Sequence, residues 1–271
     1  MNALPAETAW LWSGCAACVV AALRAWQAGL GARRTEDAWA ARWLVLSVTL
    51  VGLGIAQRWS RLGHGPFLDM FEILASSLFS LGALWLLAQH RWPLLRRAAP
   101  VSLGVLGVMA AWLPFTDPVD TFFPPTYETP VLWFHVLMGK LFLACALVAL
   151  GLAGSQLLRG RARFVDAMPG AAALDALAWR VMQVALLFES AMLVTGALWA
   201  QDAWGRWWAW DPLETWAFVT WLALVGALHA RRRWAVGPSL GAALIVGVFV
   251  LAFLTFFGVP FVSVAPHKGA V

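Results

Sequence analysis

The sequence predicts an all-α, polytopic integral membrane protein with about eight transmembrane helices and both termini on the outer side. Hydrophobic residues make up 62% of the 271 residues and charged residues only 12%, against about 25% charged in soluble domains. Apolar runs of about 20 residues, the length that crosses a bilayer, recur along the chain. Lys and Arg gather in alternate loops. These observations disfavour a soluble enzyme, and the net charge of +5 belongs to loops rather than to a nucleic-acid-binding surface.

The apolar segments leave nothing between them that is the size of a soluble domain. We therefore expect one transmembrane domain over residues 1–271. The N-terminus lacks the basic region of a signal peptide, so the first segment should remain as an anchor. The segments cover about residues 9–27, 41–57, 67–89, 98–115, 131–154, 177–200, 214–230 and 237–257.

The distribution of basic residues predicts the orientation. Fourteen lie around the loops after the first, third, fifth and seventh segments, and four lie on the opposite side. Because Lys and Arg mark cytoplasmic loops, both termini are expected outside a multi-pass protein of the cytoplasmic (inner) membrane. The fourteen are Arg24, Arg33, Arg34, Arg42, Arg91, Arg96, Arg97, Arg159, Arg161, Arg163, Arg180, Arg231, Arg232 and Arg233, and the four are Arg58, Arg61, Arg206 and Lys268.

A tryptophan-rich segment, WAQDAWGRWWAWDPLETW over residues 199–216, links the sixth and seventh spans on the expected outer face. A membrane-interface belt places one or two Trp at a helix end, whereas six in 18 residues favour stacking against a large planar apolar ligand. A transporter with a thick interface belt remains the alternative. The end of the segment, Asp211-Pro212-Leu213-Glu214, also predicts a helix start with a capping box. The six are Trp199, Trp204, Trp207, Trp208, Trp210 and Trp216.

Three of the five histidines, His64, His135 and His267, fall near the expected outer surface, where imidazoles could bind a metal, and the tryptophan-rich segment favours ligation by His135 and His267. His229 lies about 22 Å along a helix from Glu214, at the cytoplasmic end. Two imidazoles from different helices with a flat ring between them are the haem arrangement, and no His pair has the spacing of a helix-borne zinc site. His90 lies in a basic loop and is expected to be solvated, and the role of His64, in an outer loop, stays open.

Other unusual residues have simpler interpretations. Lys140 and Glu189 both lie near mid-span, and a structural ion pair is favoured over a proton pathway because no further carboxylates follow. Cys15 and Cys18 form a C-x-x-C within an apolar run, where packing is favoured over a redox pair.

The run AWGRWWAWDPLETWAFVTWL, followed by a span that ends in LHAR, resembles the WWD signature of cytochrome c assembly proteins. The similarity extends to the CcsA/ResC branch of the System II pathway: GHGPFLDMFE resembles its GHxPLxNxYE segment, LWFHVLMGKLFL its outer-histidine helix, and FFGVPFVSVAPH its C-terminal end. The chain departs from the branch in having D-P-L-E for D-P-K-E and in its terminal APHKGAV.

The resemblance implies movement of haem b across or through the membrane and its presentation for covalent attachment to apocytochrome c, which carries C-x-x-C-H. Any cytochrome c synthase (haem lyase) activity would need a ResB/CcsB-like membrane subunit, and no catalytic residue is expected in this chain. The alternatives are a haem exporter or chaperone without attachment activity and a HemX-like regulator of tetrapyrrole synthesis. The implied haem-iron ligands are His135, His267 and His229, and the implied porphyrin contacts are Trp204, Trp207, Trp208, Trp210 and Asp211.

Overall fold

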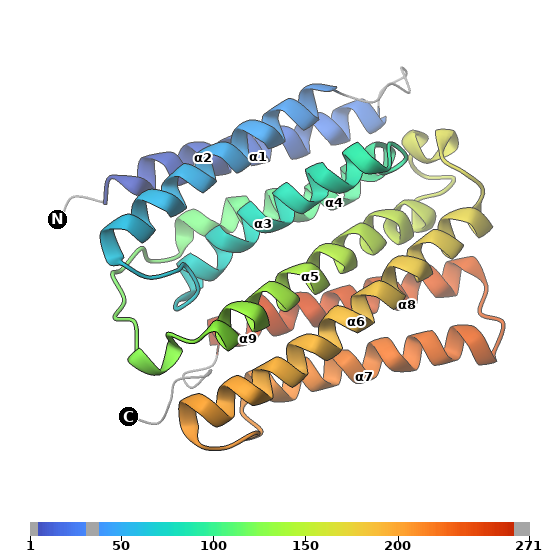
Figure 1. The fold of residues 1–271 in the computed structure, drawn as a ribbon. Helices are drawn as coiled ribbons and strands as arrows, with labels where there is room; N and C mark the ends of the chain where they lie inside the picture. The colour runs from blue at the N-terminus through green and yellow to red at the C-terminus, as the bar shows by residue number, and fades with distance from the viewer. Residues whose placement is uncertain (1–4, 31–37, 263–271) are drawn as a thin grey trace. The chain divides into compact units, whose positions relative to one another are not determined.

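The computed structural model describes residues 5–30 and 38–262, and this part of the chain is helical without strands (Figure 1). Eight of its helices are long and apolar enough to cross a membrane, which confirms the predicted fold class. The side on which the termini lie stays a prediction. The helices are α1 (Glu7–Leu30), α2 (Ala38–Leu62), α3 (Met70–Arg91), α4 (Leu95–Trp112), α5 (Pro130–Leu157), α6 (Ala171–Trp204), α7 (Pro212–Arg233) and α8 (Pro238–Phe253).

Short helical elements lie between or after the long helices of the described residues. The predicted spans agree with the long helices. The π-helix η4 and helix α9 continue α8, and together they form the eighth candidate span, Pro238–Val262. Two of the predicted segments begin before their helices: 67–89 by three residues and 237–257 by one. The short elements are η1 (Leu113–Phe115), η2 (Pro125–Tyr127), η3 (Arg163–Ala167), η4 (Leu254–Gly258) and α9 (Val259–Val262).

Helix α6 is longer than its predicted span. Its 34 residues extend about 51 Å, well beyond the roughly 30 Å hydrocarbon core of a bilayer. The helix ends at Gly205, whose φ of 70° is the left-handed cap that glycine adopts without strain. Trp199 and Trp204 therefore belong to a helix, and the connection to α7 is limited to residues 205–211.

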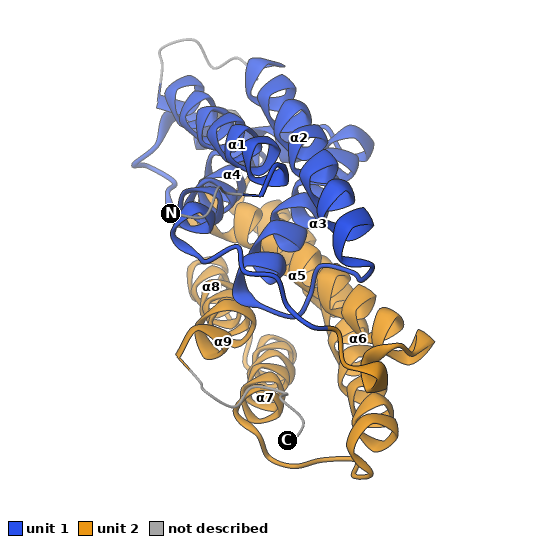
Figure 2. Ribbon diagram, turned by 90° about the vertical axis from the view of Figure 1, so that its left-hand side faces the viewer, with its two compact units in different colours: residues 1–122, 158–169 blue, residues 123–157, 170–271 orange. Residues whose placement is uncertain are grey.

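The chain forms two compact units (Figure 2). The first comprises residues 1–122 and 158–169, and the second comprises residues 123–157 and 170–271. Helices α1–α4 belong to the first unit and α5–α9 to the second. The expectation that residues 1–271 act as one transmembrane domain stays a prediction.

Small residues allow α1 and α2 of the first unit to pack closely. A Cβ atom on Gly14 would lie 2.6 Å from the Val51 side chain, and one on Gly54 would lie 2.7 Å from Leu11. Such contacts are typical of helix pairs in membranes, where van der Waals packing drives association. Cys15 and Cys18 are buried free thiols on α1, in agreement with a packing role.

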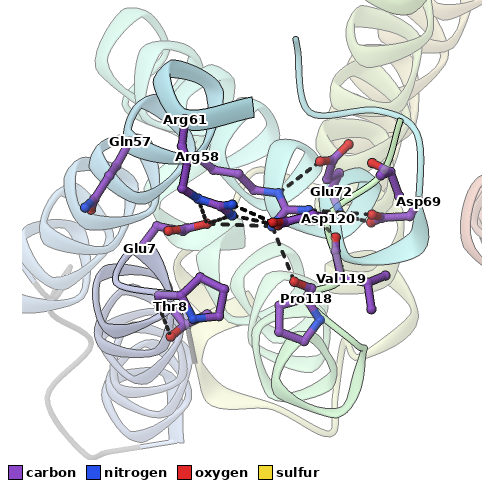
Figure 3. Close-up of polar contacts among 12 residues, drawn as sticks. Glu7, Thr8, Gln57, Arg58, Arg61, Asp69, Glu72, Pro118, Val119 and Asp120 are labelled. Atoms are coloured by element: carbon purple, nitrogen blue, oxygen red, sulfur yellow. Dashed lines mark hydrogen bonds and ion pairs between the residues drawn. The ribbon is translucent and has the colours of Figure 1, made fainter. Parts of the chain in front are cut away.

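A group of charged side chains, the Arg58 cluster, connects four segments of the first unit (Figure 3). The Arg58 guanidinium, 3% exposed, donates from Nε to Glu72 Oε1 at 2.9 Å and from a terminal nitrogen to the Val119 carbonyl. Arg61 donates to both carboxylate oxygens of Asp120, at 2.7 and 2.8 Å. Because buried charges require partners, this cluster fastens the ends of three helices to the segment after α4. Its members are Glu7, Arg58, Arg61, Asp69, Glu72 and Asp120.

Asp69 in this cluster should make stability depend on pH. It is the N-cap of α3, and its Oδ1 accepts the Glu72 N–H at 2.8 Å. Burial raises the pKa of Asp69 to about 6, above the roughly 3.9 of an unfolded chain. The folded state therefore binds a proton more tightly, and the contribution of Asp69 to stability falls as pH rises from about 4 to about 6.

Asp69→Asn keeps the cap, because Asn caps as well as Asp, and removes the charge. We expect the variant to melt above wild type near neutral pH, with the difference disappearing in acid, as measured by circular dichroism in detergent. Asp120→Asn is the matched control with the opposite sign, because the Arg61 hydrogen bonds lower the pKa of Asp120. An Asp69→Asn difference that is independent of pH would contradict this account.

Candidate functional site

His135, in the first turns of α5, is held by the backbone of α6. Its Nδ1 lies 2.9 Å from the carbonyl oxygen of Met192. Because a carbonyl oxygen only accepts hydrogen bonds, Nδ1 carries the proton and Nε2 carries the lone pair. A backbone carbonyl on one ring nitrogen is the usual way in which a metal-binding histidine is oriented. The bond to Met192 therefore fixes the orientation and the tautomer of the His135 ring.

One face of α6 shapes the space that the His135 ring occupies. A Cβ atom on Gly196 would lie 2.9 Å from Cε1 and 3.0 Å from Nδ1 of the ring, too close for any side chain. One turn further along, the Trp199 ring stands 6.3 Å from the imidazole at an interplanar angle of 17°. Met192, Gly196 and Trp199 are spaced by four and three residues, so they share this face.

Further rings extend this arrangement, which we call the Trp199 cluster: Phe123, Tyr127, His135, Trp199 and Trp204. Trp199 is almost fully buried. The Trp204 ring lies 4.8 Å from it, and the Tyr127 ring meets it edge-on at 4.9 Å. The structure thus places the predicted contact Trp204 one ring away from the predicted ligand His135.

A second group of rings, the Trp208 cluster, lies on α7 and the segment before it: Trp208, Trp210, Phe218 and Trp221. Trp208 contacts Trp210 and Phe218 at centroid distances of 5.6 and 6.2 Å, and Trp221 stacks on Phe218 at 5.9 Å. The indole of Trp221 donates to Ser190 of α6 at 2.9 Å. Trp207 and Trp210 are more than half exposed, so their faces are accessible to a ligand or a partner.

Glu214 fixes the backbone of the segment before α7. Its Oε2 accepts the N–H of Ala209 at 2.7 Å and that of Asp211 at 3.3 Å, while Asp211 Oδ1 accepts the Glu214 N–H. The predicted capping box is therefore confirmed. Between the two amides, Trp210 has a φ of 57°, which is rare for a bulky residue and persists only where its surroundings impose it.

An orphaned donor indicates what kind of ligand these residues fit. The Nε1 atom of Trp208 is buried and has no hydrogen-bond partner among the described residues, and an indole N–H can only donate. A ligand with an acceptor group such as a carboxylate would satisfy it. The exposed indole faces of Trp207 and Trp210 would suit a flat apolar ring.

The remaining predicted histidines differ in environment. His229 is exposed on the last turns of α7, and the Trp234 ring stands perpendicular to it at 6.3 Å. His267 lies outside the described residues. His64 is buried, with its two ring nitrogens 3.0 and 3.1 Å from the carbonyl oxygens of Gly65 and Thr121, as befits a structural residue.

The predicted ion pair between Lys140 and Glu189 is wrong. Glu189 is fully buried, and within the described part of the chain neither carboxyl oxygen has a hydrogen-bond partner. Helical phase explains the error. The residue of α5 that meets α6 is Gly139, where a Cβ atom would lie 3.1 Å from Met192 Sδ. Lys140 is rotated by about 100° from it around the helix axis.

Sequence reasoning missed Tyr127, Met192 and Gly196. Met192 acts through its carbonyl oxygen, which every residue has, and Gly196 through the absence of a side chain. Tyr127 is the only tyrosine in the chain, which was the one available signal.

Comparison with known proteins identifies the family. A family model described as cytochrome C assembly protein matches residues 67–267. The chain belongs to the cytochrome c assembly protein family. It is 29% identical over 246 residues to the cytochrome c biogenesis protein CcsA of Synechococcus sp. (strain CC9902), covering 78% of this chain and 80% of the relative. It is 26% identical over 253 residues to CcsA of Prochlorococcus marinus (strain MIT 9312), covering 83% and 82%.

A solved structure shares the fold of this family member. The cytochrome c heme lyase CcmF superposes with a TM-score of 0.71 at 18% sequence identity, over 95% of this chain. The chain spans about half of CcmF, 48% of its length. The resemblance to the CcsA/ResC branch noted in the sequence is thus confirmed by relatives, and the helical architecture by a known fold.

Loss of the Glu214 carboxylate should loosen the start of α7, because two backbone N–H groups lose their acceptor. We expect Glu214→Ala to lower the free energy of unfolding by about 1–2 kcal/mol, a typical value for a helix cap. Amide hydrogen exchange at Ala209 and Asp211 should accelerate in parallel. Glu214→Gln, which can still form a capping box, is the matched control. Unchanged exchange in Glu214→Ala would show that Glu214 does not hold this segment.

Proposed function

We propose that this chain moves haem b across or through the cytoplasmic (inner) membrane and presents it on the outer side for attachment to apocytochrome c. Membership of the cytochrome c assembly family supports this proposal. The observation that carries it is His135, whose Nδ1 is bonded to the Met192 carbonyl and whose ring lies beside Trp199 and Trp204. That combination provides an imidazole lone pair next to flat apolar rings.

On the outer side, His135 and His267 would be the two haem-iron ligands. The acceptor-bearing groups of haem are its two propionates, and the unpartnered Nε1 of Trp208 is a donor for one of them. Trp204, Trp207, Trp208 and Trp210 would contact the porphyrin. Asp211 would act mainly through the capping box that fixes Trp210.

At the opposite end of α7, His229 would ligate haem that enters from the cytoplasmic side. It is exposed and precedes Arg232 and Arg233, which are exposed cations suited to the propionates. We propose that a ResB/CcsB-like membrane subunit supplies the second ligand there.

Attachment joins each cysteine of the C-x-x-C-H sequence to a haem vinyl group. The thiol sulfur bonds to the vinyl carbon next to the porphyrin, and the thiol proton goes to the terminal carbon, so no net oxidation occurs. No side chain of this chain needs to act as a nucleophile. Its contribution would be positioning, which turns an encounter between two molecules into a local reaction.

Haem binding should depend on His135 and on the space beside it. We expect His135→Ala to lose or alter axial ligation in the absorption spectrum of the hemin-loaded full chain. Gly196→Ala should weaken binding in the same direction, about 10-fold or more, the usual effect of disturbing the support of a metal-binding histidine. His90→Ala, at an exposed histidine, is the control. A His135→Ala spectrum identical to wild type would remove His135 from the site.

Attachment and delivery can be separated by reconstitution. The full chain, a ResB/CcsB-like subunit, hemin and an apocytochrome with C-x-x-C-H would be combined under reducing conditions, and covalent haem would be detected on the denatured product. We expect covalent product that is lost when both apocytochrome cysteines are replaced by alanine. Haem transfer without covalent product would indicate an exporter or chaperone instead.

A further inference from the structure

Tyr127 occupies a position that the sequence did not single out. It is the last residue of η2, three residues before α5 begins. Its ring meets Trp199 edge-on, with centroids 4.9 Å apart and an interplanar angle of 84°. Phe123 packs on Tyr127 in the same manner at 6.1 Å. The ring is therefore held from two sides, in the geometry that aromatic pairs prefer.

Trp199 transmits this packing to His135. The Trp199 side chain is 2% exposed and lies almost parallel to the imidazole. Tyr127, Trp199 and His135 thus form a continuous row of rings that crosses from η2 through α6 to α5. Removal of the first ring would leave space into which the indole of Trp199 could move, away from His135.

The same tyrosine is linked to the start of α7. Burial and the negative charge of Asp211 raise the pKa of Tyr127 above its ordinary value. The phenol therefore stays neutral at physiological pH, and its ionisation senses the Asp211 carboxylate. Asp211 is the N-cap of α7, so this charge lies at the start of that helix.

We propose that Tyr127 is a positioning residue of the haem site, which fixes Trp199 against His135. The role in haem binding rests on the function proposed above, whereas the packing of the three rings does not. Tyr127 need not touch the iron or the reacting vinyl groups. It acts by keeping the surroundings of the ligand in one arrangement.

The ring and the hydroxyl group of Tyr127 can be separated by substitution. Hemin would be titrated into the purified full chain, and both the dissociation constant and the low-spin fraction would be recorded. Tyr127→Ala, which removes the ring, should weaken binding about three- to tenfold, as expected for the loss of an aromatic pair, and should lower the low-spin fraction. Tyr127→Phe, which keeps the ring, should stay within about twofold of wild type. Phe122→Ala, at an exposed ring of the same connection, is the matched control.

The outcomes distinguish the two proposals. If His135→Ala changes ligation and Tyr127→Ala matches wild type, Tyr127 is not a positioning residue. If wild type itself shows no ligation by His135, the proposed function fails. The packing of Tyr127 on Trp199 is then tested by the measurement without haem that follows.

The environment of Tyr127 can also be measured without hemin, because Tyr127 is the only tyrosine of the chain. Ultraviolet absorbance of tyrosinate in the ligand-free full chain reports Tyr127 alone, and we expect its pKa above the ordinary value. Asp211→Asn keeps the cap, because Asn is an equally good N-cap, and should lower that pKa. Asp202→Asn removes an exposed charge and should change it less. An ordinary Tyr127 pKa in wild type would contradict the burial of this ring against Trp199, and an identical titration in Asp211→Asn would show that the Asp211 charge does not act on it.

Discussion

The hydrogen bond from His135 to the Met192 carbonyl is the interaction on which the second unit depends. Inside a membrane, a polar ring must find its partner within the protein, and here the partner is a carbonyl on a neighbouring helix. The bond requires α5 and α6 to approach closely, which Gly139 and Gly196 permit. It selects the tautomer with its lone pair on Nε2, and it places Trp199 beside the imidazole. The proposed ligand chemistry and the helix packing therefore have the same origin.

The same requirement explains polar groups elsewhere in the chain. Arg58 is buried because Glu72 and two backbone carbonyls surround its guanidinium. In the last turn of α7, Arg231 pairs with the buried Asp175. Asp175 also accepts the Trp179 indole N–H at 3.1 Å. Trp208 Nε1 and the carboxyl group of Glu189 lack partners among the described residues. The proposed ligand accounts for Trp208, and nothing in the structure explains Glu189.

Patterns within one segment made much of this structure predictable. Apolar runs of bilayer length gave the eight spans, and the order Asp211, Pro212, Glu214 gave the capping box, because these features depend on neighbours in sequence. Counting basic residues by loop placed Arg58 on the outer side but could not predict its burial, since a count carries no information about partners from other segments. The pair of Lys140 with Glu189 failed for a related reason: it was predicted from depth along the spans, without considering which face of each helix the residues occupy.

The residues around His135 show most clearly which features of the site a single sequence cannot predict. His135 could be chosen from its residue type and depth. Met192, Gly196 and Tyr127 become relevant only when α6 and η2 lie beside α5, and their contributions are a carbonyl, a missing Cβ atom and a ring edge. The carbonyl and the missing Cβ atom leave no signature in a single sequence, and the only signal for the ring was that Tyr127 is the single tyrosine.

The most direct test of the central claim is a cryo-EM map of the full chain loaded with hemin, together with its membrane partner. The account predicts a porphyrin beside α5 and α6, with its iron within bonding distance of His135 Nε2 while Nδ1 remains on the Met192 carbonyl. A porphyrin bound elsewhere, with lipid or empty space against Trp199 and Trp204, would contradict it.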